Sequence, residues 1–105
     1  ALKGVFLDFN KLSRLPEEIG NLKLLEDFNL EDNALVKLPK SLCKGECESL
    51  KGLFLQNNKL AQLGFKPKLM PQLRKMSLGN NAFTGQEKAQ AEADAKEAGV
   101  ELVQN

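Results

Sequence analysis

The sequence contains no histidine, no tryptophan and no tyrosine, and its only aromatic residues are six phenylalanines. Without histidine, the chain lacks the side chain that most often serves as a general acid or base near neutral pH. It also has no phosphate-binding loop, no dinucleotide-binding glycine pattern and no G-x-S-x-G nucleophile motif. We therefore expect a non-enzymatic protein with no catalytic residues.

An excess of charge of either sign is also missing. The 15 basic and 14 acidic side chains give a net charge of +1. Domains that bind nucleic acid through its phosphates usually carry a clear basic excess. No apolar run approaches the roughly 20 residues that a membrane-spanning helix needs. We expect neither a nucleic-acid partner nor a membrane span.

Cysteine is scarce, because only Cys43 and Cys47 are present. Without histidine these two cannot complete a four-ligand zinc site, and their C-x-x-x-C spacing differs from the redox-active C-x-x-C. We expect no metal and no cofactor. Secreted repeat domains often carry several disulfides, and this sequence also lacks any N-x-S/T glycosylation site. These features favour a reducing, cytoplasmic location.

The chain does contain an internal repeat. The skeleton L-x-x-(apolar)-x-L-x-x-N-x-L occurs four times, with phenylalanine in the last position of the fourth copy. The copies start at residues 2, 25, 50 and 73, so successive starts are 23, 25 and 23 residues apart. A recurring period of this length is typical of a solenoid. In the first copy, Val5 and Leu7 alternate with Gly4, Phe6 and Asp8, which predicts a short strand with the latter three pointing outward.

Residues 2–25 read LxxVxLxxNxLxxLPxxIxxLxxL, which resembles a leucine-rich repeat. The Leu-Pro pair and the following Ile-Gly-x-Leu resemble the Ras-suppressor-like group of intracellular repeat proteins, a type that is also common in bacteria. The resemblance covers residues 2–83. It implies an α/β fold, a right-handed β–α superhelix with short parallel strands on the concave face and helical or irregular segments on the convex face.

Two repeats depart from this pattern on the predicted convex side. The second repeat has two additional residues within 43–49, which should bulge outward and leave Cys47 in an interior leucine position. The third replaces the helical tail with residues 64–71, where two prolines argue against a regular helix. We expect an irregular turn there, with three buried side chains: Phe65, Leu69 and Met70.

Residues 84–105 predict a C-terminal cap. Thr84 and Glu87 have capping-box spacing, so a helix should extend over 85–98 and end at Gly99. Residues 100–103 read as a last strand. Small side chains such as Ala89 and Ala93 should let this helix lie close to the fourth repeat.

No matching cap precedes the first repeat. We expect this N-terminal face to be bare, covered by a partner or continued by further chain. We expect residues 1–105 to form a single domain that is monomeric or self-associates weakly through that face.

Asparagine recurs at one position of every repeat, as Asn10, Asn33, Asn58 and Asn81. These amides could form a ladder of ligand-binding groups. The resemblance to leucine-rich repeats implies instead that each amide turns inward and bonds the backbone of its own loop and the next, because buried polar groups need partners. We predict a structural role.

The outward strand residues form the candidate binding site. Phe6 and Phe54 occupy outward positions, and the acidic strip from Glu26 to Asp32 lies between them. Exposed aromatics beside a charged strip are typical of an interface with apolar anchors and a charged selector. Alternatively, the rings lie over Gly4 and Gly52 and the charges are only solvated. The candidate binding residues are Phe6, Asp8, Glu26, Asp27, Asn29, Glu31, Phe54, Gln56 and Lys75.

These patterns favour a protein-binding module whose concave sheet docks a protein partner with a basic or amphipathic segment. A second hypothesis is a regulatory or targeting segment of a larger enzyme or scaffold protein, because no cap precedes the first repeat. A third is an extracellular adhesion repeat, against which the missing disulfides and glycosylation sites count. Fold alone does not decide among these functions.

Overall fold

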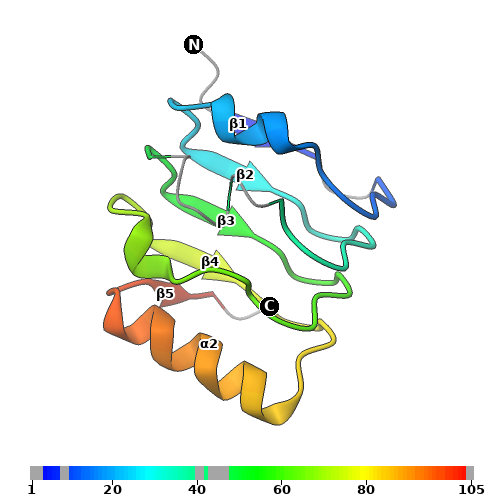
Figure 1. Ribbon diagram of the computed structural model, residues 1–105, viewed down its shortest axis with the longest axis vertical. Coiled ribbons are helices and arrows are strands. Elements are labelled where there is room, and N and C mark those ends of the chain that lie inside the picture. Colours follow the sequence, from blue (N-terminus) through cyan, green and yellow to red (C-terminus); the bar gives the residue numbers. More distant parts are fainter. Residues whose placement is uncertain (1–3, 8–9, 40–41, 43–47, 104–105) are drawn as a thin grey trace.

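The fold was determined as a computed structural model, which describes residues 4–7, 10–39, 42 and 48–103. Five short strands of the described residues follow one another along the molecule, and the α-helix α2 (Gly85–Glu97) lies beyond the last of them (Figure 1). β1 and α2 are at opposite ends (Figure 1). The repeats of the sequence are therefore stacked in chain order, as the solenoid prediction requires.

The five strands form one parallel sheet in the order β1-β2-β3-β4-β5. The strands are β1 (Gly4–Phe6), β2 (Asp27–Asn29), β3 (Gly52–Phe54), β4 (Lys75–Ser77) and β5 (Glu101–Leu102). Strand order equal to chain order means that each strand pairs with the strands of the repeats before and after it. The first four strands start 23, 25 and 23 residues apart, which is the spacing of the sequence repeat.

Two 3₁₀ turns form on the side of the chain that returns between strands. The first, η1 (Glu17–Asn21), follows Pro16, as the Leu-Pro pattern predicts. The second, η2 (Pro67–Leu69), is a single short turn where the sequence predicted an irregular one. Phe65 and Met70 are buried as predicted, but Leu69 is 51% exposed and that prediction was wrong. Pro67 takes the buried position of this turn and leaves Leu69 facing solvent.

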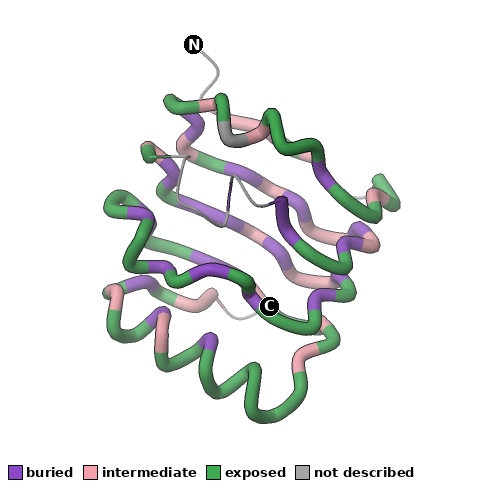
Figure 2. The backbone as a smooth tube through the Cα atoms, viewed as in Figure 1, coloured by how far each residue is buried: buried purple, intermediate pink, exposed green. Residues whose placement is uncertain are grey.

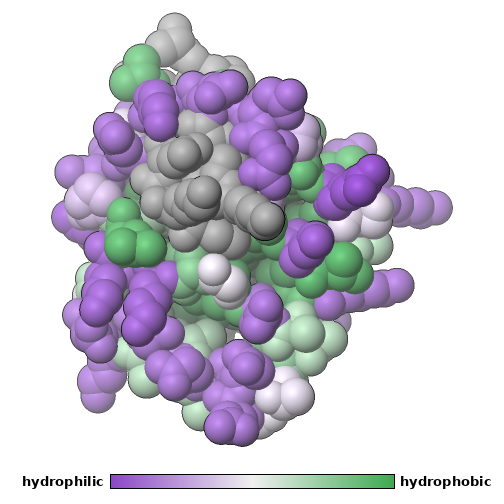
Figure 3. All heavy atoms as spheres, viewed as in Figure 1, coloured by the Kyte–Doolittle hydropathy of each residue, from purple (hydrophilic) through white to green (hydrophobic). Residues whose placement is uncertain are grey.

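The leucines of the repeats fill the interior. The two middle repeats are buried most completely: Phe28, Leu30, Leu53 and Leu55 have no exposed surface. Buried residues therefore recur in β2, β3 and β4, whereas α2 is exposed over most of its length (Figure 2). On the face drawn in Figure 3, hydrophilic side chains cover most of the surface outside the grey atoms. Leu42 is also fully buried, while the predictions for Cys43 and Cys47 lie outside the described residues.

The recurring asparagines have the predicted structural role, but Asn33, Asn58 and Asn81 bond the preceding loop, so the prediction that they bond the next loop was wrong. The Asn33 Oδ1 atom accepts hydrogen bonds from the backbone N–H groups of Asn10 and Leu12, at 3.0 and 2.9 Å. Its Nδ2 group donates to the carbonyl oxygens of Leu7 and Leu30, at 2.9 and 3.0 Å. Asn58 and Asn81 repeat this geometry one and two turns further on. Each amide therefore ties its own loop to the preceding one.

The C-terminal cap forms as predicted, with two corrections. The Thr84 Oγ1 atom accepts a 3.1 Å hydrogen bond from the Glu87 N–H and caps α2. The helix ends at Glu97, one residue before the predicted end, and Gly99 follows the C-cap residue Ala98 with a φ of 74° that suits glycine. The packing face was predicted wrongly, because the buried alanines are Ala91 and Ala95 rather than two other alanines of the helix, Ala89 and Ala93.

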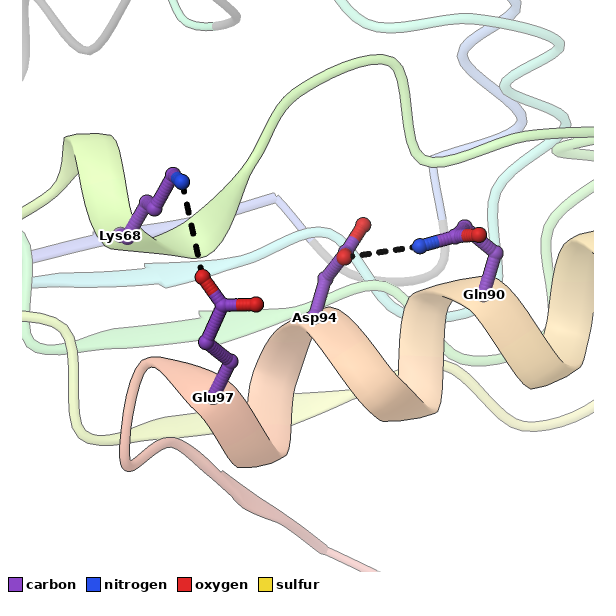
Figure 4. A network of polar contacts seen from close by, with 4 residues as sticks. All are labelled: Lys68, Gln90, Asp94 and Glu97. Atoms are coloured by element: carbon purple, nitrogen blue, oxygen red, sulfur yellow. Dashed lines mark hydrogen bonds and ion pairs between the residues drawn. The ribbon is translucent and has the colours of Figure 1, made fainter.

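A surface ion pair also links the cap to the third repeat. Lys68 on η2 approaches Glu97 on α2, with 3.5 Å between Nζ and Oε1 (Figure 4). Both side chains are more than half exposed, so this contact adds little stability of its own. The buried alanine face is therefore what holds the helix to the solenoid.

Candidate functional site

The outward side chains of the strands form columns across the sheet. The strand register places Gly4, Asp27, Gly52 and Lys75 side by side. It also places Phe6, Asn29, Phe54 and Ser77 side by side. We call the surface built from these residues and their outward neighbours Glu31 and Gln56 the concave surface. The register brings the predicted site residues of β1 to β4 together, whereas Asp8 lies outside the described residues.

The two phenylalanines of the concave surface lie over the glycines two residues before them. A Cβ atom added to Gly52 would stand 3.0 Å from Cε2 of Phe54, and one added to Gly4 would stand 3.1 Å from Cε2 of Phe6. The missing side chains therefore make room for the rings. Phe6 is still 67% exposed, whereas Phe54 is half-buried.

The acidic strip is only partly free. Glu26 pairs with Lys51 across the edge of the sheet, at 3.4 Å. Asp32 accepts a 2.7 Å hydrogen bond from the amide of Asn57. Asp27 is exposed and Glu31 is half-buried, and neither carboxylate forms an ion pair with any residue in the described ranges. Negative charge on the concave surface is therefore concentrated at these two side chains.

A second polar ladder runs beside the recurring asparagines and was not predicted. Asn80 donates from Nδ2 to Asn57 Oδ1 at 2.8 Å, and Asn57 donates in turn to Asp32. All three have a positive φ, between 53° and 61°. Asparagine and aspartate tolerate this left-handed conformation better than most residues. The signal was present in the sequence, because three repeats have Asp or Asn directly before the recurring asparagine.

Two polar atoms of the concave side are buried without a hydrogen-bond partner. They are the Ser77 Oγ atom and the Gln56 Oε1 atom. The register places Ser77 in the outward column of Phe54, yet it has no exposed surface. Ser77 has a short side chain and lies beside Phe54 in the same column. Larger neighbouring side chains therefore form the exposed surface at the position of Ser77.

Metal and membrane sites are not evident in the parts of the chain that the structure describes. No group of three or more cysteine, aspartate or glutamate side chains is arranged there to hold a metal ion. Among the same residues, no helix is both long enough and apolar enough to cross a membrane.

The geometry defines a class of protein: a solenoid of short parallel strands whose turns are bonded by one asparagine per repeat. No family model and no curated protein matches the sequence. Among solved structures, a leucine-rich repeat protein of Leptospira interrogans superposes with a TM-score of 0.87 and 31% sequence identity. The match covers 98% of this chain and 25% of that chain. The chain is a leucine-rich repeat protein with an α/β solenoid fold, and so a repeat module of the protein-interaction type.

Proposed function

We propose that the chain is a non-enzymatic module that docks a protein partner on the concave surface, and that the partner presents a basic segment. The observation that carries this proposal is the position of Phe6, a large apolar side chain that is 67% exposed. On the next strand lies the carboxylate of Asp27, which forms no ion pair with any described residue. Isolated exposed apolar residues are ordinary on a protein surface. An aromatic next to concentrated charge supports an interface.

The two phenylalanines have different roles in this proposal. Phe6 has the larger exposed surface, so its burial by a partner removes more apolar area from water. Phe54 already packs on Gly52 and contributes a fixed, half-buried ring. A partner that covers both rings spans three strands, because β2 lies between β1 and β3. The anchor residues are therefore Phe6 first and Phe54 second.

The charged part of the proposal rests on Asp27 and Glu31. Both are free of ion pairs within the described part of the chain, whereas Glu26 is already paired with Lys51. Lys75 lies on β4, next to the strand that carries Phe54, and belongs to the same column as Asp27. Asn29, between the rings, keeps its Oδ1 on the Glu31 N–H, at 3.0 Å. A partner with positive charge opposite β2 and none opposite β4 is complementary to this pattern.

Affinity capture from native lysate, followed by binding measurements with variants, tests the proposal. We expect Phe6→Ala and Glu31→Lys each to weaken binding of the captured partner at least tenfold. Two matched changes away from the strands are the controls: Val36→Ala removes a similarly exposed apolar side chain, and Glu18→Lys makes the same charge reversal on η1. If the controls weaken binding as much as the concave variants do, the partner uses another surface.

The second hypothesis, a segment of a larger enzyme or scaffold protein, also has a supporting observation. The interior side chains Val5, Leu7 and Leu12 are only half-buried, whereas their counterparts in the middle repeats are fully buried. The chain spans a quarter of the Leptospira protein it resembles. We propose that residues 1–105 fold as one domain and, when alone, self-associate weakly through this half-buried face. Analytical ultracentrifugation decides this point, because Leu12→Glu should abolish any concentration-dependent association.

We also propose a cytoplasmic location, supported by the low cysteine content. Alkylation of native material should find the thiols of Cys43 and Cys47 free. A disulfide between them would favour the extracellular adhesion hypothesis instead.

A further inference from the structure

In the middle of the sheet, a carboxylate and an aromatic ring meet above a glycine. The register pairs Gly52 of β3 with Asp27 of β2, and Phe54 follows Gly52 by two residues, on the same face of β3. A Cβ atom added to Gly52 would stand 3.0 Å from Asp27 Oδ1 and 3.0 Å from Phe54 Cε2. Because both atoms are 3.0 Å from one point, they are at most 6.0 Å apart, which is twice that distance. The absent side chain of Gly52 therefore lets a negative charge and a ring approach each other.

The carboxylate of Asp27 is turned toward one of its two glycine neighbours. Asp27 is in register with Gly4 on one side and with Gly52 on the other. Its Oδ1 atom lies 3.0 Å from the Cβ position of Gly52. At Gly4, the atoms of the described residues that come within 4 Å of the equivalent position belong to Phe6. The carboxylate therefore accompanies the ring of Phe54 and not the ring of Phe6.

This carboxylate has no counter-charge within the described ranges. Asp27 is exposed and forms no ion pair there. Lys75 is the next member of the same column, beyond Gly52, and its ammonium group does not pair with Asp27. Phe54 is half-buried, so part of its ring still faces solvent. A negative charge beside a partly exposed ring forms a place that a cation can occupy.

The chemistry of the two groups selects the kind of cation. A cation is attracted to an aromatic ring when it lies within about 6 Å of the ring centre, and a carboxylate adds a charge-assisted hydrogen bond. A guanidinium group is planar, is weakly hydrated, and can stack on a ring while it donates two N–H groups to a carboxylate. An ammonium group is compact and strongly hydrated, so it loses more hydration beside a ring. Asp27 and Phe54 together therefore favour arginine over lysine.

We propose that Asp27 and Phe54 form a subsite for an arginine side chain of the protein partner. The guanidinium group donates hydrogen bonds to the Asp27 carboxylate and stacks on the Phe54 ring above Gly52. This inference rests on the proposed function, because it names the residue by which the basic segment of the partner is recognised. Phe54 then differs from Phe6: it binds a cation, whereas Phe6 supplies apolar area.

Titration of the full chain with a blocked glycine–arginine–glycine tripeptide, followed by ¹H–¹⁵N NMR spectroscopy, tests the proposal. We expect a dissociation constant of about 5 mM, in keeping with the small affinity of a short, flexible ligand. The backbone amide signals of Gly52 and Phe54 should shift, and those of Gly4 and Phe6 should not. The matching lysine tripeptide should bind about threefold more weakly. The citrulline tripeptide, which has nearly the same shape and no charge, should bind about tenfold more weakly.

Two pairs of variants separate this subsite from general attraction between charges. Asp27→Asn should weaken binding of the arginine tripeptide about fivefold, whereas Glu26→Gln, which removes the same charge from the neighbouring residue, should change it less than about twofold because Glu26 is already paired with Lys51. Phe54→Leu should weaken binding about threefold and abolish the preference for arginine over lysine, whereas Phe6→Leu should do neither. Asp27 is exposed, so its variant should keep the fold, which an unchanged spectrum outside the subsite would verify.

Equal binding of the arginine and lysine tripeptides would overturn the inference, as would equal effects of Asp27→Asn and Glu26→Gln. The proposed function fails in a different way. If the tripeptide behaves as expected while the captured partner ignores Phe6→Ala and Glu31→Lys, arginine binding at the subsite stands and docking on the concave surface is wrong. If the partner responds to those variants while the tripeptide leaves the Gly52 signal unmoved, docking stands and the subsite is wrong.

Discussion

The first and third repeats have the same skeleton but bury it to different extents. Leu7 and Leu55 occupy the same repeat position, yet Leu7 is half-buried and Leu55 has no exposed surface. The third repeat has a neighbour on both sides, because β3 pairs with β2 and β4, whereas β1 pairs with β2 alone. Burial in a solenoid is thus supplied by neighbouring repeats. Leucines at the same position of different repeats should therefore contribute unequally to stability.

Truncation of the equivalent leucine in the first and third repeats should have the largest effect on stability. Leu55→Ala should lower the free energy of unfolding by about 3 to 4 kcal/mol, because it leaves a cavity in the most buried layer. Leu7→Ala should lower it by only about 1 to 1.5 kcal/mol, because solvent already reaches that site. Urea unfolding followed by circular dichroism measures both. Equal losses would mean that the first repeat is covered as fully as the third.

Replacing the recurring asparagine in the third and first repeats tests the same difference in burial. Asn58→Ala should cost about 2 to 3 kcal/mol, because buried carbonyl groups of Leu30 and Leu55 lose their donors and the N–H of Leu35 loses its acceptor. Asn10→Ala should cost about 0.5 to 1 kcal/mol, because Asn10 is exposed and water can replace its bond to Leu7. Thermal unfolding of the two variants distinguishes these values. A larger loss for Asn10 would contradict the burial argument.

The glycines beneath the two rings should respond in different directions. Gly52→Ala should destabilise by about 1 to 2 kcal/mol, because the new Cβ would stand 3.0 Å from both the half-buried Phe54 ring and Asp27 Oδ1. Within the described part of the chain, a Cβ atom at Gly4 would contact the exposed Phe6 ring, which can swing aside. Gly4→Ala should therefore be neutral or stabilising by about 0.5 kcal/mol. Unfolding midpoints in urea measure both variants. Equal losses of stability for Gly52→Ala and Gly4→Ala would mean that the Phe6 and Phe54 rings are equally fixed.

The smallest effect is expected for the ion pair between the second and third repeats. Lys51→Gln removes the 3.4 Å contact with Glu26 and should change stability by less than about 0.5 kcal/mol, because Lys51 is 55% exposed. The remaining difference should vanish in 1 M salt, where exposed charges are screened. A loss above about 1 kcal/mol that disappears in 1 M salt would show that charges, and not burial alone, distinguish the repeats.

Much of the fold was predictable from the sequence because the leucine and asparagine spacings are periodic. Strand positions, the parallel register, the 3₁₀ turn after Pro16 and the cap at Thr84 all followed from local pattern. The face of α2 did not, because its many alanines give no apolar stripe, and only the packing selected Ala91 and Ala95. Leu69 was placed wrongly for a similar reason, since two prolines removed the helical period from that turn.

The candidate site was predicted as a set of positions, and its chemistry was decided by contacts. Alternation along the strands is enough to place Phe6, Asn29 and Phe54 on one surface. It does not determine that Glu26 pairs with Lys51, that Asp32 bonds Asn57, or that Ser77 is covered. Those outcomes depend on side chains from repeats 23 to 25 residues away.

The sequence by itself determined the solenoid, because a fixed period of inward leucines and one asparagine per turn can be satisfied only by stacking the repeats. Tertiary structure alone decided how completely each repeat is buried and which acidic groups on the concave surface pair with other described residues. The physical reason is the separation along the sequence of the residues that interact. Strand and turn formation depend on residues within one repeat, whereas burial, ion pairing and donor satisfaction depend on which repeat, or which face of α2, lies alongside.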